Sequence, residues 1–344
     1  MASEDLKSEF ESAISDASSS LSECSESLSS LREAVSKLDA YAINLPTRLE
    51  ALRSRGFVYR AGLEKQLEKL IDGWMKVRRD FLASVEEAEE RFSSQIESLR
   101  RELDSLRMIF EPKSGDLEKA KRLKLEAENL SRTIKNSVDE LLASVEALSR
   151  SFSSVEGAVS HAEYALNELG RSKVQLREGE HVVGAFRVKL LGDDKRKGYL
   201  YVTSERLIFE EEREEVLKKV LFIATKKRKI REVALEFPIG YVKDASPGRV
   251  GFFAGKGVYI TLTDGRALTF DMDDYLVDSL IRDINYVLSG EADRDRVDAV
   301  PEAGGLKIKV IKCPYCGAPV RVQLVRGLRS VTCEYCGSTI AIQQ

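Results

Sequence analysis

The first half of the chain is dominated by one pattern, in which apolar residues recur at alternating intervals of three and four. In the first segment these positions are Phe10, Ile14, Ala17, Leu21, Cys24, Leu28, Leu31, Val35, Leu38 and Ala42. Such spacing lines up side chains on one face of an α-helix, the heptad pattern of coiled coils. Cys24 falls on this face as a small apolar residue.

The same pattern predicts two more long helices, with seams from Leu63 to Phe110 and from Leu123 to Leu169. Proline cannot donate the helical hydrogen bond, so Pro46 predicts that the first helix ends near Asn44. The sequence EPKSGD at 111–116 predicts a turn that ends in a capping aspartate.

Short connections between long helices favour antiparallel neighbours, so residues 1–170 are predicted to form a rod-like three-helix bundle or coiled coil. A rod of this kind is typical of a spacer or of an element for homo-oligomerisation. A membrane-bending dimer like a BAR domain is the alternative. The charged residues Arg78 and Arg79 are expected to lie in solvent.

Beyond residue 177 the apolar period changes to two, which predicts β-strands. The expected strands are 182–191, 198–203, 206–212, 229–237, 239–244, 257–263 and 266–271. A helix is expected behind capping aspartates at 271–274, with its apolar face on Leu276, Leu280, Ile284 and Val287. Residues 171–290 are therefore predicted to form a curled antiparallel sheet whose open end is closed by one helix.

One segment of this sheet carries a family likeness. Tyr199-Leu200-Tyr201-Val202-Thr203 is followed by two polar residues and then by Arg206-Leu207-Ile208-Phe209. This order of residues resembles the second hairpin of the pleckstrin-homology (PH) superfamily, in particular its GRAM and bacterial PH branches. The resemblance covers about a third of the chain and implies the fold but not the ligand, since such domains bind lipids, peptides or proteins. An insertion at 213–228 departs from the family and is expected to lengthen a loop or add a helical turn.

The insertion holds the densest basic run of the sequence, and its candidate anion- or lipid-binding residues are Lys218, Lys219, Lys226, Lys227, Arg228, Lys229 and Arg231. Basic clusters of this size attract anionic head groups, and the apolar residues at 220–223 are suited to insert between lipids. The alternative is a solvated edge whose charge is neutralised by the glutamates at 210–215. Both interpretations remain open from the sequence.

Four cysteines near the carboxy terminus predict a metal site. After a polar linker at 291–305, residues 306–344 contain two Cys-x-x-Cys-Gly motifs, formed by Cys313 with Cys316 and by Cys333 with Cys336. This spacing brings four thiolates onto one structural Zn²⁺, and metal binding would supply the folding free energy that a core of this size lacks. Gly317 and Gly337 are predicted to adopt left-handed turns, and VRVQLV and SVTC to form a hairpin. The segment resembles the zinc-ribbon superfamily.

Composition narrows the class of protein. The chain has 344 residues, 32% of them charged, and lacks an apolar run long enough to span a bilayer. A cytoplasmic location is therefore expected, with peripheral membrane association as an extension of it. High charge with few Asn, Gln, Met and Cys is typical of thermophiles, and an archaeal source is expected. The two histidines, His161 and His181, are expected to stand apart from any cysteine or carboxylate cluster, which disfavours hydrolytic enzymes.

The multi-domain α + β organisation predicts a non-enzymatic scaffold or adaptor. Its rod would set distance or dimerise, while the PH-like module and the zinc ribbon recruit a protein partner to a membrane surface or large complex. The alternative is a nucleic-acid- or ribosome-associated factor that uses the ribbon and the basic residues at 226–231.

Overall fold

The structure is a computed structural model that describes residues 2–192, 194–220, 223–250, 255–297, 308–323 and 330–341. The side chains of residues 2–3, 215–228, 308–309 and 323 lie outside this description. The chain divides into two compact units, Met1–Asn44 with Leu67–Ser154 and Ile308–Gln344, and Leu45–Gln66 with Val155–Lys307. Within the described residues, no helix combines the length and apolar character that crossing a membrane requires. The predicted fold class is confirmed: three long helices precede an antiparallel sheet, a short helix and a cysteine cluster.

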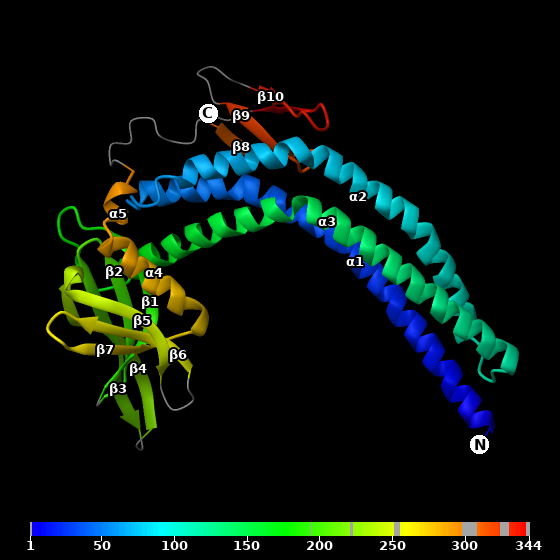
Figure 1. The fold of residues 1–344 in the computed structure, drawn as a ribbon, viewed down its shortest axis with the longest axis horizontal. Coiled ribbons are helices and arrows are strands. Elements are labelled where there is room, and N and C mark those ends of the chain that lie inside the picture. Colours follow the sequence, from blue (N-terminus) through cyan, green and yellow to red (C-terminus); the bar gives the residue numbers. More distant parts are fainter. Residues whose placement is uncertain are drawn as a thin grey trace. The chain divides into compact units, whose positions relative to one another are not determined.

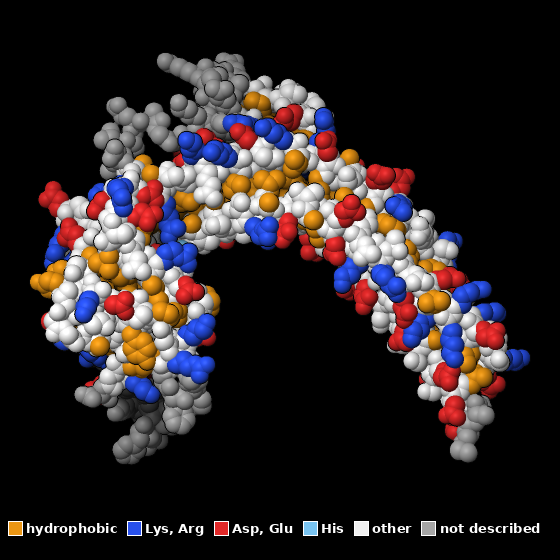
Figure 2. Space-filling model, viewed as in Figure 1, with side chains coloured by type: hydrophobic (Ala, Val, Ile, Leu, Met, Phe, Trp, Pro, Cys, Tyr) orange, Lys and Arg blue, Asp and Glu red, His pale blue; other side chains and the backbone are white. Residues whose placement is uncertain are grey.

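The three long helices α1 (Ala2–Ser54), α2 (Leu63–Arg107) and α3 (Ser114–Gly170) run side by side (Figure 1). In the first unit α1 is antiparallel to α2, because Ser18 contacts Arg107 and Asp39 contacts Arg78. The predicted seams form the core, which at one end of the bundle consists of Phe10, Ala13, Ala17, Leu21, Leu103, Leu106, Ala120, Leu123 and Ala127. Charged side chains of both signs are scattered along the visible face of the helices, with hydrophobic and uncharged groups between them (Figure 2).

The predicted end of the first helix was wrong. α1 continues through Pro46 to Ser54, although a proline inside a helix costs about 3 kcal/mol. Buried apolar side chains continue the seam on both sides of the proline, at Leu45, Leu49 and Leu52, and offset that cost. The division between the two compact units falls between Asn44 and Leu45, next to the proline.

The turn between α2 and α3 also differs from expectation. α2 ends at Arg107, so Phe110 lies beyond the helix with 83% of its surface exposed and does not extend the seam. Asp116 does take part in capping α3. Its carboxylate accepts a hydrogen bond of 3.1 Å from the backbone N–H of Lys113, which precedes the helix.

The second unit contains a seven-stranded antiparallel sheet with the order β4-β3-β2-β1-β7-β6-β5. The strands are β1 (Val182–Leu191), β2 (Arg196–Thr203), β3 (Arg206–Val220), β4 (Ile223–Pro238), β5 (Val242–Val250), β6 (Gly255–Leu262) and β7 (Ala267–Asp271). The short helices are η1 (Ile239–Tyr241), η2 (Asp274–Leu276), α4 (Val277–Leu288) and α5 (Glu291–Arg294). β1 is the central strand that pairs with both β2 and β7, and α4 contacts β1, β2, β5 and β6. This is the antiparallel sheet followed by a helix that the apolar period predicted.

The aspartates before α4 do not cap it, contrary to expectation. The residue that precedes α4 makes no capping hydrogen bond with its side chain. Asp274 instead accepts a 3.0 Å hydrogen bond from the backbone N–H of Lys256, and Asp271 forms a 2.9 Å ion pair with Lys189 on β1. These carboxylates therefore bond to residues of β1 and β6 in the sheet.

Apart from residues 221–222, which lie outside the description, the insertion at 213–228 is β-strand rather than a loop or a helical turn. It lengthens β3 and β4, which pair from Arg206↔Pro238 to Val220↔Ile223, whereas β2 pairs with β3 only as far as Glu211. Residues 212–220 and 223–231 therefore form a two-stranded hairpin beyond the rest of the sheet. We call this segment the β3–β4 arm.

The last turns of α3 belong to the core of the sheet domain. Ala165, Leu166 and Leu169 pack with Val174, Val182, Ala185, Tyr199, Tyr201 and Ile208. His161 Nε2 lies 2.6 Å from Oδ2 of Asp283 on α4, and the Asp283 side chain is only 2% exposed. The expectation that His161 stands apart from carboxylates was therefore wrong, because α3 and α4 are distant in sequence but adjacent in this unit.

Gly184 on β1 permits this contact. A Cβ atom at position 184 would collide with Oδ2 of Asp283 and lie 3.0 Å from Nε2 of His161. We predict that Gly184→Ala destabilises the sheet domain by about 1–3 kcal/mol, because both partners belong to a packed core. Gly240→Ala is the control, since a Cβ there meets open space. Hydrogen exchange of the β1 and β2 amides measures the difference, and equal protection in the two variants would contradict this role for Gly184.

Candidate metal centre

The four predicted cysteines come together at one point. The Sγ atoms of Cys313, Cys316, Cys333 and Cys336 all lie within 4.8 Å of one another. Sγ of Cys316 is 3.7 Å from that of Cys333, and the same distance separates Cys313 from Cys336. The first cysteine of each motif is buried and the second is exposed.

Each cysteine motif is a turn closed by backbone hydrogen bonds. The N–H of Gly317 donates to the Cys313 carbonyl over 2.9 Å, and Gly337 repeats this bond to Cys333. Both glycines have positive φ, +75° and +71°, as predicted, a conformation that other residues rarely adopt. We call these two turns the first and second knuckle.

The hairpin expected between the knuckles is replaced by two. Each knuckle forms the turn of its own hairpin, β8 (Ile308–Lys312) with β9 (Pro319–Gln323) and β10 (Ser330–Thr332) with β11 (Thr339–Ala341). Within the described parts of the two segments, residues 320–323 and 330–332 therefore belong to strands of different hairpins. This arrangement places two thiols from each turn against two from the other.

The cysteine cluster fits a metal ion by its chemistry. Four thiolates that converge from two rigid turns suit tetrahedral coordination of Zn²⁺ and similar ions. A hydrogen bond from the Ser338 hydroxyl, together with the Ser338 backbone N–H, lowers the pKa of Cys336 to about 6. These bonds favour the thiolate of Cys336, the form of cysteine that binds metals, whereas burial raises the pKa of Cys316 to about 12.

The second knuckle contacts the bundle along one face of α2. The ring of Tyr335 lies over the guanidinium of Arg78, 4.6 Å from the ring centroid, and its hydroxyl donates to Sδ of Met75 over 3.2 Å. Arg321 on β9 forms an ion pair with Asp72. Positions 72, 75 and 78 are three residues apart, so they share one side of the helix.

Arg78 is buried, which corrects the expectation that it lies in solvent. The residue is 5% exposed, and its Nε and Nη2 each donate a 2.8 Å hydrogen bond to the carboxylate of Asp39 on α1. Trp74 Nε1 donates a third bond to that carboxylate over 2.9 Å. The side chain of Arg79 is 85% exposed, as expected. One feature of the sequence indicates that Arg78 is buried: it follows Trp74 by four residues, which is about one turn of the helix.

The basic residues proposed for anion binding divide into two groups by their place in the β3–β4 arm. Glu212, Glu214 and Glu215 lie opposite Arg231, Lys229 and Arg228 in the register. Opposite charges across neighbouring strands attract each other, so this part of the arm is close to neutral. Lys218 lies opposite Lys226, and Lys227 lies opposite Val216. The side chains of Lys218, Lys219, Lys226, Lys227 and Arg228 lie outside the described residues.

Arg231 lies in a cluster of carboxylates rather than on a free surface. Its guanidinium is 3.1 Å from Glu168 on α3 and 3.4 Å from Glu212, and it lies 4.1 Å from the ring centroid of Tyr199. Glu210 is fully buried, 3.8 Å from Arg231, and accepts a hydrogen bond from the backbone N–H of Lys173. Burial, with the neighbouring Glu210 carboxylate, raises the pKa of Tyr201. This cluster joins α3 to the sheet.

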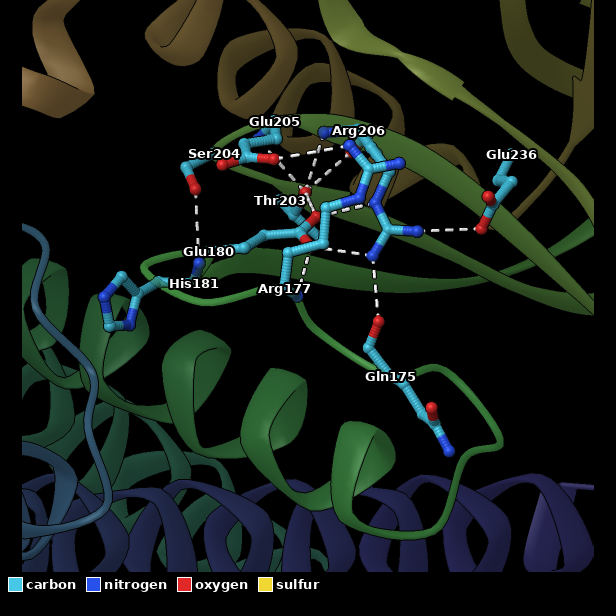
Figure 3. A network of polar contacts seen from close by, with 9 residues as sticks. All are labelled: Gln175, Arg177, Glu180, His181, Thr203, Ser204, Glu205, Arg206 and Glu236. Carbon is cyan, nitrogen blue, oxygen red and sulfur yellow. Dashed lines mark hydrogen bonds and ion pairs between the residues drawn. The ribbon is translucent and has the colours of Figure 1, made fainter.

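The Thr203–Arg206 motif that carries the PH resemblance is also internal (Figure 3). Thr203 Oγ1 accepts hydrogen bonds from the backbone N–H groups of Glu205 and Arg206 and donates to Glu180 over 2.5 Å. Arg206 donates to both carboxylate oxygens of Glu180, to the Gln175 carbonyl and to Glu236. These bonds fix the β2–β3 turn against the segment that follows α3.

Comparisons with known proteins leave the family open. No family model matches the chain, and no curated protein matches it. Among solved structures, the DH/PH domains of a p115-RhoGEF mutant share 12% identity, with a TM-score of 0.24 over 80% of this chain and 98% of that one. A structure of the Vav1 exchange factor with its PH and C1 domains shares 11% identity, with a TM-score of 0.25 over 93% and 97%. The C-terminal domain of an unknown Leishmania infantum protein shares 14%, with a TM-score of 0.22 over 36% and 93%.

We predict that Arg231→Gln destabilises the sheet domain by about 3–5 kcal/mol, because it removes the cation nearest to several buried carboxylates. Arg213→Gln is the matched control on the same arm. The Arg213 side chain is 55% exposed in its ion pair with Glu232, and exposed pairs contribute about 1 kcal/mol or less. Hydrogen exchange in β2 and β3 distinguishes the variants. Similar protection in both would show that Arg231 does not hold the cluster together.

Proposed function

We propose that this chain is a non-enzymatic adaptor in which a helical rod presents a PH-like module of the GRAM or bacterial PH type. The observation that supports this is the shared core of α3 and the sheet, in which Leu166 and Leu169 pack with Ala185 and Tyr201. A helix that packs into the module holds it more firmly than a flexible linker would. Such a connection suits a scaffold that presents a binding surface.

The cysteine cluster acts in this proposal as a structural zinc site. All four positions of a tetrahedral Zn²⁺ are taken by Cys313, Cys316, Cys333 and Cys336, which leaves none open for water or substrate. The zinc would stabilise residues 306–344 as a ribbon, since their apolar core is small.

The proposed partner is a protein that the adaptor recruits to a membrane surface or a large complex in the cytoplasm. The charge pairing described above favours this over nucleic acid, because Lys229, Arg231 and Arg321 already contact carboxylates. Contact with anionic lipid would fall to the end of the β3–β4 arm, where Lys218, Lys219, Lys226 and Lys227 have no acidic partner in the register. Self-association of the rod would use its outer surface, since the seam residues are buried within one chain.

We predict that the purified protein carries about one Zn²⁺ per chain, because the four thiolates make one closed site. Metal analysis of protein purified without added zinc measures the ratio. Cys333→Ser should abolish tight binding, whereas Cys24→Ser should not, since Cys24 is buried on the α1 seam. Protein that retains an ordered ribbon with no metal would contradict the proposal.

We also predict that changing Lys218, Lys219, Lys226 and Lys227 to Ser abolishes salt-dependent binding to vesicles that contain phosphatidylserine. The control changes Arg228 and Lys229 to Ser, residues that lie opposite Glu215 and Glu214, and should retain most of the binding.

The same three proteins are also tested for binding to single-stranded RNA. We expect weak RNA binding at physiological salt, because the phosphate backbone requires an unpaired basic surface. RNA binding stronger than vesicle binding, and lost in the same variant, would favour the nucleic-acid alternative. Equal vesicle binding by all three proteins would rule out the arm as the lipid contact.

A further inference from the structure

The two knuckles carry matched tyrosines with different surroundings. Tyr315 and Tyr335 each lie two residues after the first cysteine of their motif, in the sequences CPYCG and CEYCG. Tyr315 is 70% exposed, whereas Tyr335 is partly buried against α2. The same position in two similar turns therefore has different surroundings. Tyr315 can serve as the control when the contact of Tyr335 with the bundle is tested.

The bundle holds Arg78 in an orientation that receives Tyr335. Two of its nitrogens, Nε and Nη2, are bound side by side to Asp39, so the edge of the guanidinium is occupied and its flat face remains available. A planar guanidinium can bind a carboxylate and stack on an aromatic ring at once, which a lysine cannot. The ring of Tyr335 takes that face.

A continuous series of contacts links the cysteine cluster to the only tryptophan of the chain. Tyr335 lies between the ligand positions Cys333 and Cys336, so the shape of the second knuckle sets where its ring points. Tyr335 contacts Arg78, Arg78 is bonded to Asp39, and Asp39 accepts a hydrogen bond from Trp74 Nε1. Trp74 is fully buried, so its environment is set by these neighbours.

We propose that the second knuckle is a metal-dependent latch, in which metal binding places Tyr335 on the Arg78–Asp39 pair and fastens the ribbon to α2. This inference rests on the proposed zinc site. The individual contacts are a cation–π stack, a hydrogen bond to Met75 and an ion pair between Arg321 and Asp72. Each is weak, so they act together only while the knuckle is rigid. Loss of the metal removes that rigidity and frees the ribbon from the helix.

The test uses emission from Trp74 in the full chain, before and after zinc is removed with a chelator and then restored. In the unaltered protein we expect a reversible change in emission. In Tyr335→Leu we expect this change to be lost, with emission close to that of the zinc-free protein throughout. In Tyr315→Leu we expect the same change as in the unaltered protein, because that ring is 70% exposed.

Two further measurements show which step has failed when the emission does not change as expected. Zinc content shows whether the ribbon of Tyr335→Leu still folds, and hydrogen exchange at residues 72–79 reports the covered face of α2 directly. A zinc-loaded Tyr335→Leu protein that keeps the full emission change and the full protection would overturn the latch. Unaltered protein that loses zinc with no change at Trp74 or at residues 72–79 would also overturn it. A protein that binds no zinc would instead refute the metal centre itself.

Discussion

α3 contributes to both compact units of the chain, and most other features depend on how its two ends pack. Near its start, Ala120, Leu123 and Ala127 complete the core between α1 and α2. Near its end, Ala165, Leu166 and Leu169 cover β1 and β2. One apolar stripe therefore changes partner along a single helix. The small side chains at 120, 127 and 165 allow close approach in both cores, since alanine fills little of the space between packed elements.

Buried ion pairs join neighbouring elements within each of the two units. Asp39, Glu210 and Asp283 are buried carboxylates, and each has a basic partner from a different element, Arg78, Arg231 and Arg60. A buried ion pair adds little net stability compared with apolar packing, but an unpaired buried charge is costly. A shift of α1 against α2 would separate Asp39 from Arg78, and a shift of the β3–β4 arm would separate Glu210 from Arg231. We interpret the pairs as selecting one arrangement among several that the apolar seams alone would tolerate.

Local patterns in the sequence predicted the elements better than they predicted contacts. The heptad seams, the period of two after residue 177 and the Cys-x-x-Cys-Gly spacing each depend on neighbouring residues. Each located its elements, although Val77 and Phe110 on the predicted second seam are exposed. The helix end predicted at Pro46 was wrong, because buried leucines on both sides of the proline keep the helix intact. The EEEREE sequence of β3 resembles a charged helix or loop, and its strand pairing depends on β4. Arg78 and His161 could not be placed, because Asp39 and Asp283 come from other helices.

The contact between the ribbon and α2 is made mainly by polar and aromatic side chains. The core of the ribbon is small and includes Val320, Val322 and Ile340 together with two of the cysteines. An apolar contact would make the ribbon depend on the bundle for folding and would leave an exposed apolar patch whenever it separated. Tyr335 on Arg78 avoids this, because Arg78 keeps its carboxylate partner Asp39 with or without the ring. Separation then exposes a paired charge and one tyrosine and breaks the ion pair between Arg321 and Asp72. A ribbon that keeps its metal would therefore part from α2 and rejoin it without unfolding.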